Sequence, residues 1–221
     1  MRAGQRLVAS DGYEVMLFPL EYMYMSQDEG GDYSHLYTYS IDLLGWGANG
    51  RIYHCPYYAP CSCKCVNTTF TSHSRVFTSL DKVHLPDGTL DYVTFNTMHD
   101  NNPIASLNEV FTQGDLIGHT GTAGNVTGDH VHFNTARGTY QGFYDVGTGH
   151  YQLRNSTHVY NTCYVNDTVI RQGYGHNWQT YTGPTPPPTP SYKKYHFKWV
   201  LYANKLRAQR SNYWHFLKNI I

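Results

Sequence analysis

The stretch that decides the fold is Gly114-Asp-Leu-Ile-Gly-His-Thr-Gly-Thr-Ala-Gly-Asn-Val-Thr-Gly-Asp-His-Val-His-Phe-Asn-Thr-Ala-Arg137. Its order predicts a turn, a glycine-rich loop and then a strand from Asp129 to Ala136. Side chains on a strand alternate between its two faces, so the imidazoles of His130 and His132 point the same way, roughly 6–7 Å apart along the backbone. A pair placed like this can share one metal-centred site, with one ring binding the ion and the other facing what the ion activates.

The glycines before this pair bear on whether the His-x-His is a metal site or a coincidence. The chain has 13 histidines, so such a pair can also arise by chance. A plain surface hairpin rarely needs four glycines, whereas positive φ angles or a close backbone approach require them. The four are Gly118, Gly121, Gly124 and Gly128. The loop therefore favours a metal site.

Three motifs in this stretch resemble those of the lysostaphin-like (M23) zinc peptidases, which cut peptide bonds in bacterial cell walls. They are Gly-Asp-x-Ile-Gly, the Gly/Thr-rich loop and His-x-His-Phe. The resemblance spans roughly residues 30–137. It implies an all-β fold of mainly antiparallel sheets that form a groove, a Zn²⁺ cofactor, and hydrolysis of stem or cross-bridge peptides of peptidoglycan. It leaves open which peptide bond is cut.

The same resemblance implies three metal ligands, His35, Asp42 and His132. Two imidazoles and one carboxylate leave a catalytic zinc with an open position for water. The family usually has three residues between its first His and the Asp; here there are six, which resembles the Ser-His-x-Gly-x-x-x-x-Asp of wall-cutting phage members. A separation of seven puts the two residues on opposite faces of an ideal strand, so we expect a bulge or a loop between them. The alternative for Asp42 is a turn-capping aspartate.

The resemblance also implies two catalytic histidines beside the metal, His99 and His130. One takes a proton, and the other stabilises the intermediate or protonates the leaving amine; which does which stays open. His84 and His119 are rivals for the place of His99. We favour His99 because a strand of the predicted hairpin ends at it.

That hairpin is the clearest local signal in the chain. Residues 75–98 are rich in Val, Phe, Thr and Tyr on both sides of Pro86-Asp-Gly-Thr89. This composition is typical of two strands, and Pro-Asp-Gly is typical of the turn between them. Asn49-Gly50 predicts a second tight turn.

The cysteines offer the main competing chemistry. They are Cys55, Cys61, Cys63, Cys65 and Cys163, an odd number that argues against a disulfide framework. Cys61, Cys63 and Cys65 alternate and so face one side of a strand; they could bind a structural zinc, but their spacing favours core packing. A Cys-His wall hydrolase using Cys55 or Cys163 is an alternative function. A non-catalytic wall-binding module of the same fold is another.

Charge and hydropathy narrow the partners and the location. The 16 basic residues balance the 16 acidic ones, so no overall field attracts nucleic acid. No run of 18 apolar residues predicts a membrane span. The first residues lack the apolar core of a secretory signal. We therefore expect cytoplasmic synthesis, holin-dependent release and action on bacterial peptidoglycan, as a monomeric phage or prophage lysin.

A proline-rich segment sets the predicted domain boundary. We expect a peptidase domain at residues 1–182, in which Tyr-rich short strands after residue 138 finish the sheet and wall the groove. A stiff polyproline linker follows at 183–191. The tail at 192–221 has seven Lys/Arg and no acid. It predicts a basic amphipathic helix for an anionic wall polymer or membrane surface, with a packing helix or a partly disordered tail as the alternative.

Overall fold

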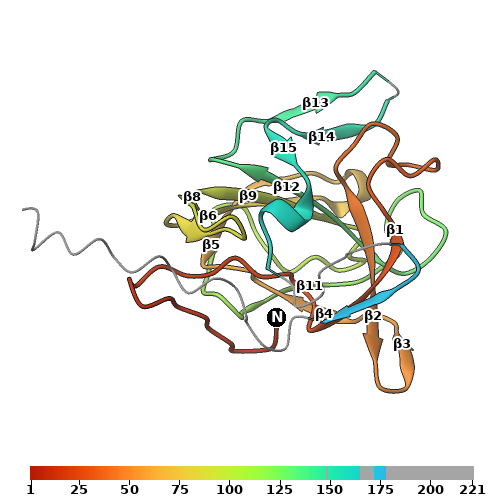
Figure 1. Ribbon diagram of the computed structural model, residues 1–221. Helices are drawn as coiled ribbons and strands as arrows, with labels where there is room; N and C mark the ends of the chain where they lie inside the picture. Colours follow the sequence, from red (N-terminus) through yellow and green to blue (C-terminus); the bar gives the residue numbers. More distant parts are fainter. Residues whose placement is uncertain (148, 165–171, 178–221) are drawn as a thin grey trace, which may run out of the picture. The chain divides into compact units, whose positions relative to one another are not determined.

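The structure is a computed structural model, which describes residues 1–147, 149–164 and 172–177 (Figure 1). The predicted linker at 183–191 and the predicted basic tail at 192–221 lie outside these residues, so both stay predictions. Among the described residues, no helix is long and apolar enough to cross a bilayer.

The described part of the chain is built from antiparallel strands, which confirms the expected all-β fold. Ten strands form the main sheet, in the order β10-β5-β6-β9-β12-β2-β1-β16, with β3 paired to β2 and β15 paired to β12. The bounds are β1 Tyr22–Gln27, β2 Ile41–Gly47, β3 Gly50–Ile52, β5 Cys63–Thr68, β6 Arg75–Ser79, β9 Val93–Met98, β10 Val110–Phe111, β12 Val131–Arg137, β15 Ser156–Thr157 and β16 Gly175–Asn177.

Three two-stranded sheets complete the strand structure. They pair β4 (Pro56–Tyr58) with β11 (Leu116–His119), β7 (Val83–His84) with β8 (Leu90–Asp91), and β13 (Phe143–Asp145) with β14 (Tyr151–Leu153). The β13–β14 hairpin projects from the end of the main sheet in Figure 1. Among the described residues after 138, β15 and β16 extend the main sheet, whereas β13 and β14 form a sheet of their own.

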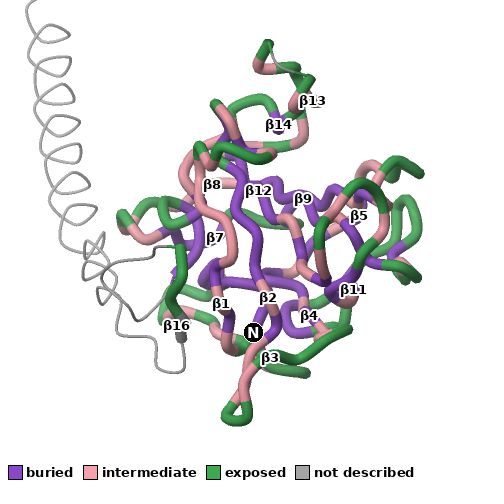
Figure 2. The backbone as a smooth tube through the Cα atoms, turned by 90° about the vertical axis from the view of Figure 1, so that its right-hand side faces the viewer, coloured by how far each residue is buried: buried purple, intermediate pink, exposed green. Residues whose placement is uncertain are grey.

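Aromatic side chains from neighbouring central strands form the core. The Phe77 and Phe95 rings stack with centroids 4.9 Å apart, and Phe133 lies 6.1 Å from Phe95. Figure 2 shows the central strands as the buried part of the tube and the β13–β14 hairpin as largely exposed. Burial of such rings stabilises the sheet.

The cysteine triplet packs in this core. Cys61, Cys63 and Cys65 are free thiols and fully buried. Burial raises the pKa of Cys61 and Cys63 well above the ordinary range, so both are neutral thiols. This agrees with core packing rather than with a metal site.

The predicted hairpin is present, with an interruption in each arm. β6 pairs with β9, and β7 pairs with β8 next to the turn. In the turn, Leu85 N donates to Thr89 O at 3.0 Å, and the Asp87 carboxylate accepts from Thr89 N at 3.0 Å. β9 ends at Met98, so the chain presents His99 directly after the strand, as expected.

The position of β12 between β2 and β9 brings distant residues together. His132 is opposite Asp42 of β2 on one side and opposite Met98 of β9 on the other. β12 begins at Val131 rather than at Asp129, because His130 instead forms an isolated bridge with Gly121.

Three of the four loop glycines are needed for close approach or for an unusual backbone angle. A Cβ at Gly118 would lie 2.3 Å from the Tyr57 hydroxyl, and one at Gly121 would lie 2.2 Å from the His99 carbonyl oxygen. Gly124 has φ +94°. The prediction is wrong for Gly128, where a Cβ would meet only the flexible Arg51 side chain at 3.4 Å.

These two environments allow a matched pair of substitutions. We expect Gly121→Ala to lower the free energy of unfolding by about 1–3 kcal/mol, because the new methyl group clashes with a backbone carbonyl that cannot move alone. Gly128→Ala should stay close to the wild type. Urea unfolding of both variants measures the difference, and equal stabilities would contradict the packing described here.

Candidate metal centre

A loop between β1 and β2 holds His35 at the bottom of the site. The side chain is fully buried, and its Nδ1 donates to the Asp28 carbonyl oxygen at 3.1 Å. As expected, a loop separates His35 from the strand that carries Asp42, so both side chains can reach the same site although they are seven positions apart. Tyr37 has φ 62° in the loop, a left-handed conformation that favours glycine. Glycine stands at the corresponding place of the phage-type motif His-x-Gly-x-x-x-x-Asp.

The three predicted ligands meet at one point. Asp42 Oδ1 lies 3.2 Å from His35 Nε2 and 3.2 Å from His132 Nδ1. The two ring nitrogens are 3.1 Å apart. Within the described residues, this is the group of His, Cys, Asp and Glu side chains that could hold a metal ion. The structure therefore brings together His35, Asp42 and His132.

The charge of this cluster resides on Asp42. Burial would raise the pKa of Asp42, but the neighbouring imidazoles of His132 and His35 outweigh burial and hold the pKa well below its ordinary value. Burial lowers the pKa of His132, and the Asp42 carboxylate opposes that shift only in part. A carboxylate beside a neutral imidazole is the protonation state in which both side chains can bind a cation.

The two predicted catalytic histidines lie beside this cluster. The His99 ring centroid is 4.6 Å from that of His130 and 5.9 Å from that of His132. His130 Nε2 lies 3.4 Å from Asp42 Oδ1. Burial, followed by the neighbouring charges of His132 and His130, lowers the pKa of His99 to about 3.

Hydrogen bonds to carbonyl oxygens fix the orientation of both rings. His99 Nδ1 donates to Ala123 O at 2.7 Å, and His130 Nδ1 donates to Gly128 O at 2.8 Å. A carbonyl can only accept, so Nδ1 carries a hydrogen in each ring, and Nε2 is the atom left to exchange a proton with a substrate. Both acceptor residues belong to the glycine-rich loop, which thus orients the two histidines.

The rival histidines lie elsewhere. His84 Nε2 pairs with Asp11 Oδ2 at 2.9 Å, and His119 is at the end of β11 with its Nδ1 4.0 Å from Asp100. Neither of them lines the groove described next. The geometry supports the choice of His99 over both.

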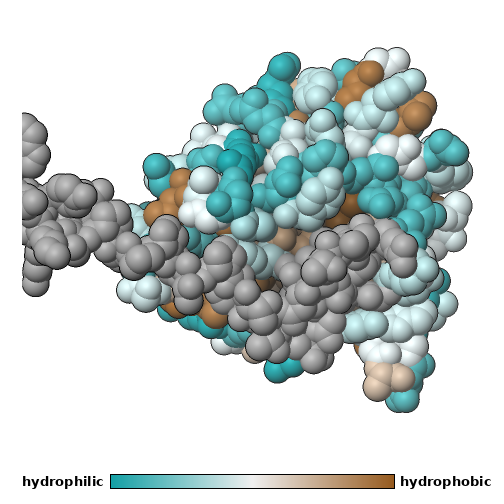
Figure 3. All heavy atoms as spheres, in the orientation of Figure 1, coloured by the Kyte–Doolittle hydropathy of each residue, from teal (hydrophilic) through white to brown (hydrophobic). Residues whose placement is uncertain are grey.

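A groove of about 770 Å³ opens over the cluster. Asp42, His99, His130 and His132 line it. Its walls come from the loop before β2, the turn at residues 69–74, the glycine-rich loop and the β13–β14 hairpin. Figure 3 shows one face of the molecule as mostly hydrophilic, with isolated hydrophobic patches.

Sequence reasoning missed several of these groups. Ser72 and Ser74 line the groove from the turn before β6, and neither was predicted. Phe143 and Tyr151 line it from the β13–β14 hairpin, which agrees with the expectation that the strands after residue 138 wall the groove. The Asp28 carbonyl, which holds His35, was also missed. No local signal identifies them, because each is brought to the site by contacts between segments far apart in the chain.

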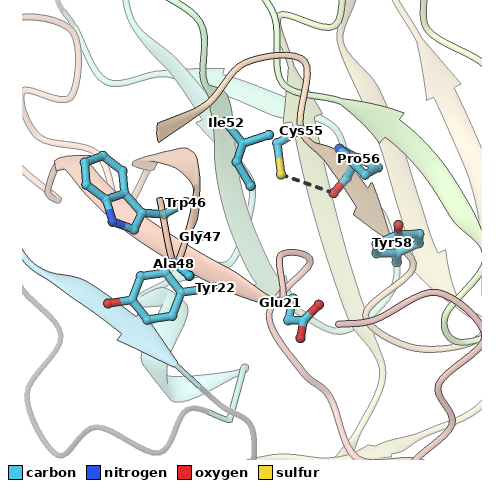
Figure 4. A pocket seen from close by; sticks show the side chains of 9 residues that line it. All are labelled: Glu21, Tyr22, Trp46, Gly47, Ala48, Ile52, Cys55, Pro56 and Tyr58. Carbon is cyan, nitrogen blue, oxygen red and sulfur yellow. Dashed lines mark hydrogen bonds between the residues drawn. The ribbon is translucent and has the colours of Figure 1, made fainter. Parts of the chain in front are cut away.

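A second hollow, of about 620 Å³, lies apart from the metal cluster (Figure 4). Tyr22, Trp46 and Tyr58 contribute aromatic side chains to it, together with the half-buried Cys55. Its carboxylate, Glu21, pairs with Arg2 at 2.7 Å. Burial raises the pKa of Cys55 to about 11, so this hollow holds no thiolate at neutral pH.

The same argument weakens the Cys-His alternative. Burial raises the pKa of Cys163 to about 12. A nucleophilic cysteine needs a lowered pKa and access to solvent, and Cys163 is buried. Neither Cys55 nor Cys163 lines the groove.

Comparison with known proteins gives a phage relative. No family model matches the chain. Over 175 residues, the chain is 35% identical to Morphogenesis protein 1 of Bacillus phage B103. The match covers 77% of this chain but 46% of the phage protein, so the chain spans about half the length of that relative.

Solved structures with a similar arrangement include three peptidases. One is a zinc-containing peptidase from Vibrio cholerae (TM-score 0.41, 15% identity, 60% of this chain and 43% of that chain). Another is the catalytic domain of lysostaphin from Staphylococcus simulans (TM-score 0.40, 17% identity, 55% of this chain and 84% of that chain). The third is the catalytic domain of the prophage-encoded M23 protein EnpA from Enterococcus faecalis, in a mutant form (TM-score 0.39, 17% identity, 53% of this chain and 82% of that chain).

The lowered histidine pKa values predict a pH-dependent stability for the metal-free protein. In the unfolded chain His99 titrates near 6.5, but in the folded protein its pKa is about 3. Between these values only the unfolded chain binds the proton. The free energy of unfolding therefore falls by about 1.4 kcal/mol for each unit by which the pH is lowered, for one such group. His132 acts in the same direction.

Urea unfolding between pH 6.5 and 4.5 measures this slope. Asp42 does not interfere, because its depressed pKa affects stability only near and below its unfolded value of 3.8. His99→Gln should give a shallower slope than the wild type. Identical slopes would show that His99 does not carry the effect.

Proposed function

We propose that this chain is a zinc-dependent peptidase that hydrolyses peptide bonds of bacterial peptidoglycan. The observation that carries the proposal is the convergence of His35, Asp42 and His132 beside His99 and His130. Five chemically matched side chains from three separate parts of the chain meet at the floor of one groove.

The ligand atoms fit a zinc ion. Tetrahedral ligands about 2.0–2.2 Å from zinc lie about 3.3–3.6 Å from one another. The three separations between the ring nitrogens and Asp42 Oδ1 are 3.1, 3.2 and 3.2 Å, so closing around an ion requires only small movements. Two neutral donors and one carboxylate are also a common ligand set for catalytic zinc.

The two remaining histidines supply the proton transfers. Bound zinc polarises a carbonyl and activates water for attack. The Nδ1 atoms of His99 and His130 are both bound to carbonyl oxygens, which leaves Nε2 of either ring to accept the proton of the attacking water. The ring that is protonated in this way can then donate to the leaving amine, and its partner can hydrogen-bond the oxyanion. We leave the order between the two rings open.

Peptidoglycan is proposed as the substrate from the motifs and the groove. The groove is large enough for a short peptide, and hydroxyl side chains such as Ser34, Thr71 and Ser72 line it. Hydroxyl groups can donate to and accept from a peptide backbone. The proposal names only the class of bond, a peptide bond in a stem or in a cross-bridge, and does not specify which one is cut.

The experiment separates metal binding from catalysis. We expect His132→Ala to lose both zinc and wall hydrolysis, because it removes a ligand. His130→Ala and His99→Ala should retain zinc but lose hydrolysis by at least about 100-fold, the usual contribution of a positioned acid or base. Zinc content of each purified protein and release of fragments from cell walls are the two measurements.

Two outcomes would overturn the proposal. Loss of zinc from all three variants would remove the division between ligands and catalytic histidines. Wall binding by a zinc-loaded wild type without any released fragments would favour a non-catalytic wall-binding module.

We propose a phage origin and place the enzyme on the phage particle. The supporting observation is the name of the 35%-identical relative, a morphogenesis protein. This differs from the free lysin expected from the motifs, although both act on peptidoglycan. A lysin would be released by a holin and need not enter the particle.

Fractionation of a lysate tests this placement. We expect an antibody against this chain to detect it in purified particles. Detection only in the soluble fraction of the lysate would favour the lysin.

A further inference from the structure

The loop that carries His35 is fastened to a segment far along the chain. Glu29 Oε1 accepts from Val159 N at 3.0 Å, and Glu29 Oε2 pairs with His158 Nδ1. The Glu29 side chain is only 11% exposed. The Glu29 carboxylate is thus largely removed from water and has two hydrogen-bond partners in its place.

Aromatic contacts hold His158 in place. The Tyr39 ring lies edge-on to His158 with centroids 4.7 Å apart, and Tyr160 stacks on it at 4.9 Å. Tyr39 is at the other end of the His35 loop, and its backbone N donates to Gln152 Oε1 at 3.1 Å. Both ends of the loop therefore contact the part of the chain that runs from β14 to residue 160.

A short series of contacts links Glu29 to His35. Glu29 follows Asp28, whose carbonyl oxygen accepts from His35 Nδ1 at 3.1 Å. This bond leaves Nε2 of the ring directed at Asp42 and His132. The position of the Asp28 peptide therefore sets the rotation of the His35 ring.

The other end of the link leads to His132. His158 directly follows β15, and β15 pairs with β12 through Thr135 and Ala136. β12 also carries His132. The Glu29–His158 pair thus connects the loop that carries His35 to the strand that carries His132. This connection is additional to the pairing of β2 with β12 in the sheet.

We infer that Glu29 and His158 are positioning residues for the metal centre: their pair fixes the Asp28 carbonyl, and through it the His35 ring, relative to His132. The inference rests on the proposed zinc site, because it assigns the pair a role in metal binding. Groups that orient a metal ligand commonly change metal affinity by 10–100-fold when they are removed.

Three variants test the separate contacts of the Glu29–His158 pair. Glu29→Ala removes both contacts, and we expect zinc binding at least about 10-fold weaker. Glu29→Gln retains an oxygen for Val159 N and an amide for His158, so it should bind zinc nearly as the wild type does. His158→Phe keeps the ring between Tyr39 and Tyr160 but removes Nδ1, and should weaken zinc binding as well.

Asp11→Ala is the matched control. Asp11 and His84 form another His–carboxylate pair, with Oδ2 and Nε2 2.9 Å apart, and His84 is buried. This pair fastens the turn at residues 9–13 to β7 and has no contact with the metal centre. We expect Asp11→Ala to lose stability without losing zinc affinity.

Zinc dissociation constants from chelator competition, together with the unfolding midpoint of each metal-free protein, are the measurements. Wild-type affinity in both Glu29→Ala and His158→Phe would overturn the inference. So would an equal loss in Asp11→Ala, because destabilisation alone would then explain the effect. If Glu29→Ala does not fold, His158→Phe decides.

A metal-free readout separates this inference from the zinc proposal. Nitrogen NMR of the His35 ring reports which nitrogen carries the hydrogen. We expect a single Nδ1–H form in the wild type and a mixture in Glu29→Ala. If no protein binds zinc but this difference is present, the zinc proposal fails and the positioning role stands; an unchanged ring in Glu29→Ala contradicts the positioning role.

Discussion

The antiparallel pairing of β12 with β2 is the constraint on which the site depends. Its register places His132 opposite Asp42, and the same strand pairs with β9 on its other edge. Because side chains alternate along a strand, a slip of one residue would turn His132 away from Asp42. The buried Phe133, on the opposite face of β12, makes such a slip costly, since it would bring an aromatic ring out of the core.

Local chemistry determines the parts of the site that could be predicted from the sequence. The alternation of His130 and His132 and the hairpin ending at His99 each follow from a few adjacent residues. The run of glycines indicated a close approach at Gly121, although its partner, the His99 carbonyl, is far away in the sequence. The motif resemblance added His35 and Asp42, but only the structure shows that a loop with an unusual Tyr37 joins them.

Long-range contacts explain what could not be predicted. Glu29 and His158 are 129 positions apart in the chain, and no spacing rule relates them. The Tyr-rich composition after residue 138 predicted that this segment walls the groove, but no motif within it identifies Phe143 or Tyr151 as the lining residues. Gly128 is the opposite case. Its place in the loop predicted that glycine is required there, but a Cβ at this position would meet only the flexible Arg51 side chain.

The electrostatics of the site follow from its burial. Asp42 is ionised although it is buried, because imidazole hydrogen bonds compensate for the lost hydration. Burial is the largest cause of the lowered pKa of His99, and the crowded imidazoles of His132 and His130 lower it further, because a proton on one ring raises the cost of a proton on the next. One divalent ion would neutralise Asp42 without protonating any ring, which makes a cation a better partner for this cluster than protons are.

The proposed ligands also differ in how firmly the fold holds them. Asp42 and His132 belong to paired strands of the central sheet, whose backbone hydrogen bonds restrict their movement. His35 belongs to a loop that includes a left-handed Tyr37, a conformation that costs free energy. A loop with such a cost keeps its geometry only if other contacts select it. The backbone bond from Thr38 N to His35 O is within the loop, so it cannot set the position of the loop against the sheet. Contacts outside the loop must do so, and Glu29 and Tyr39 provide them near its two ends.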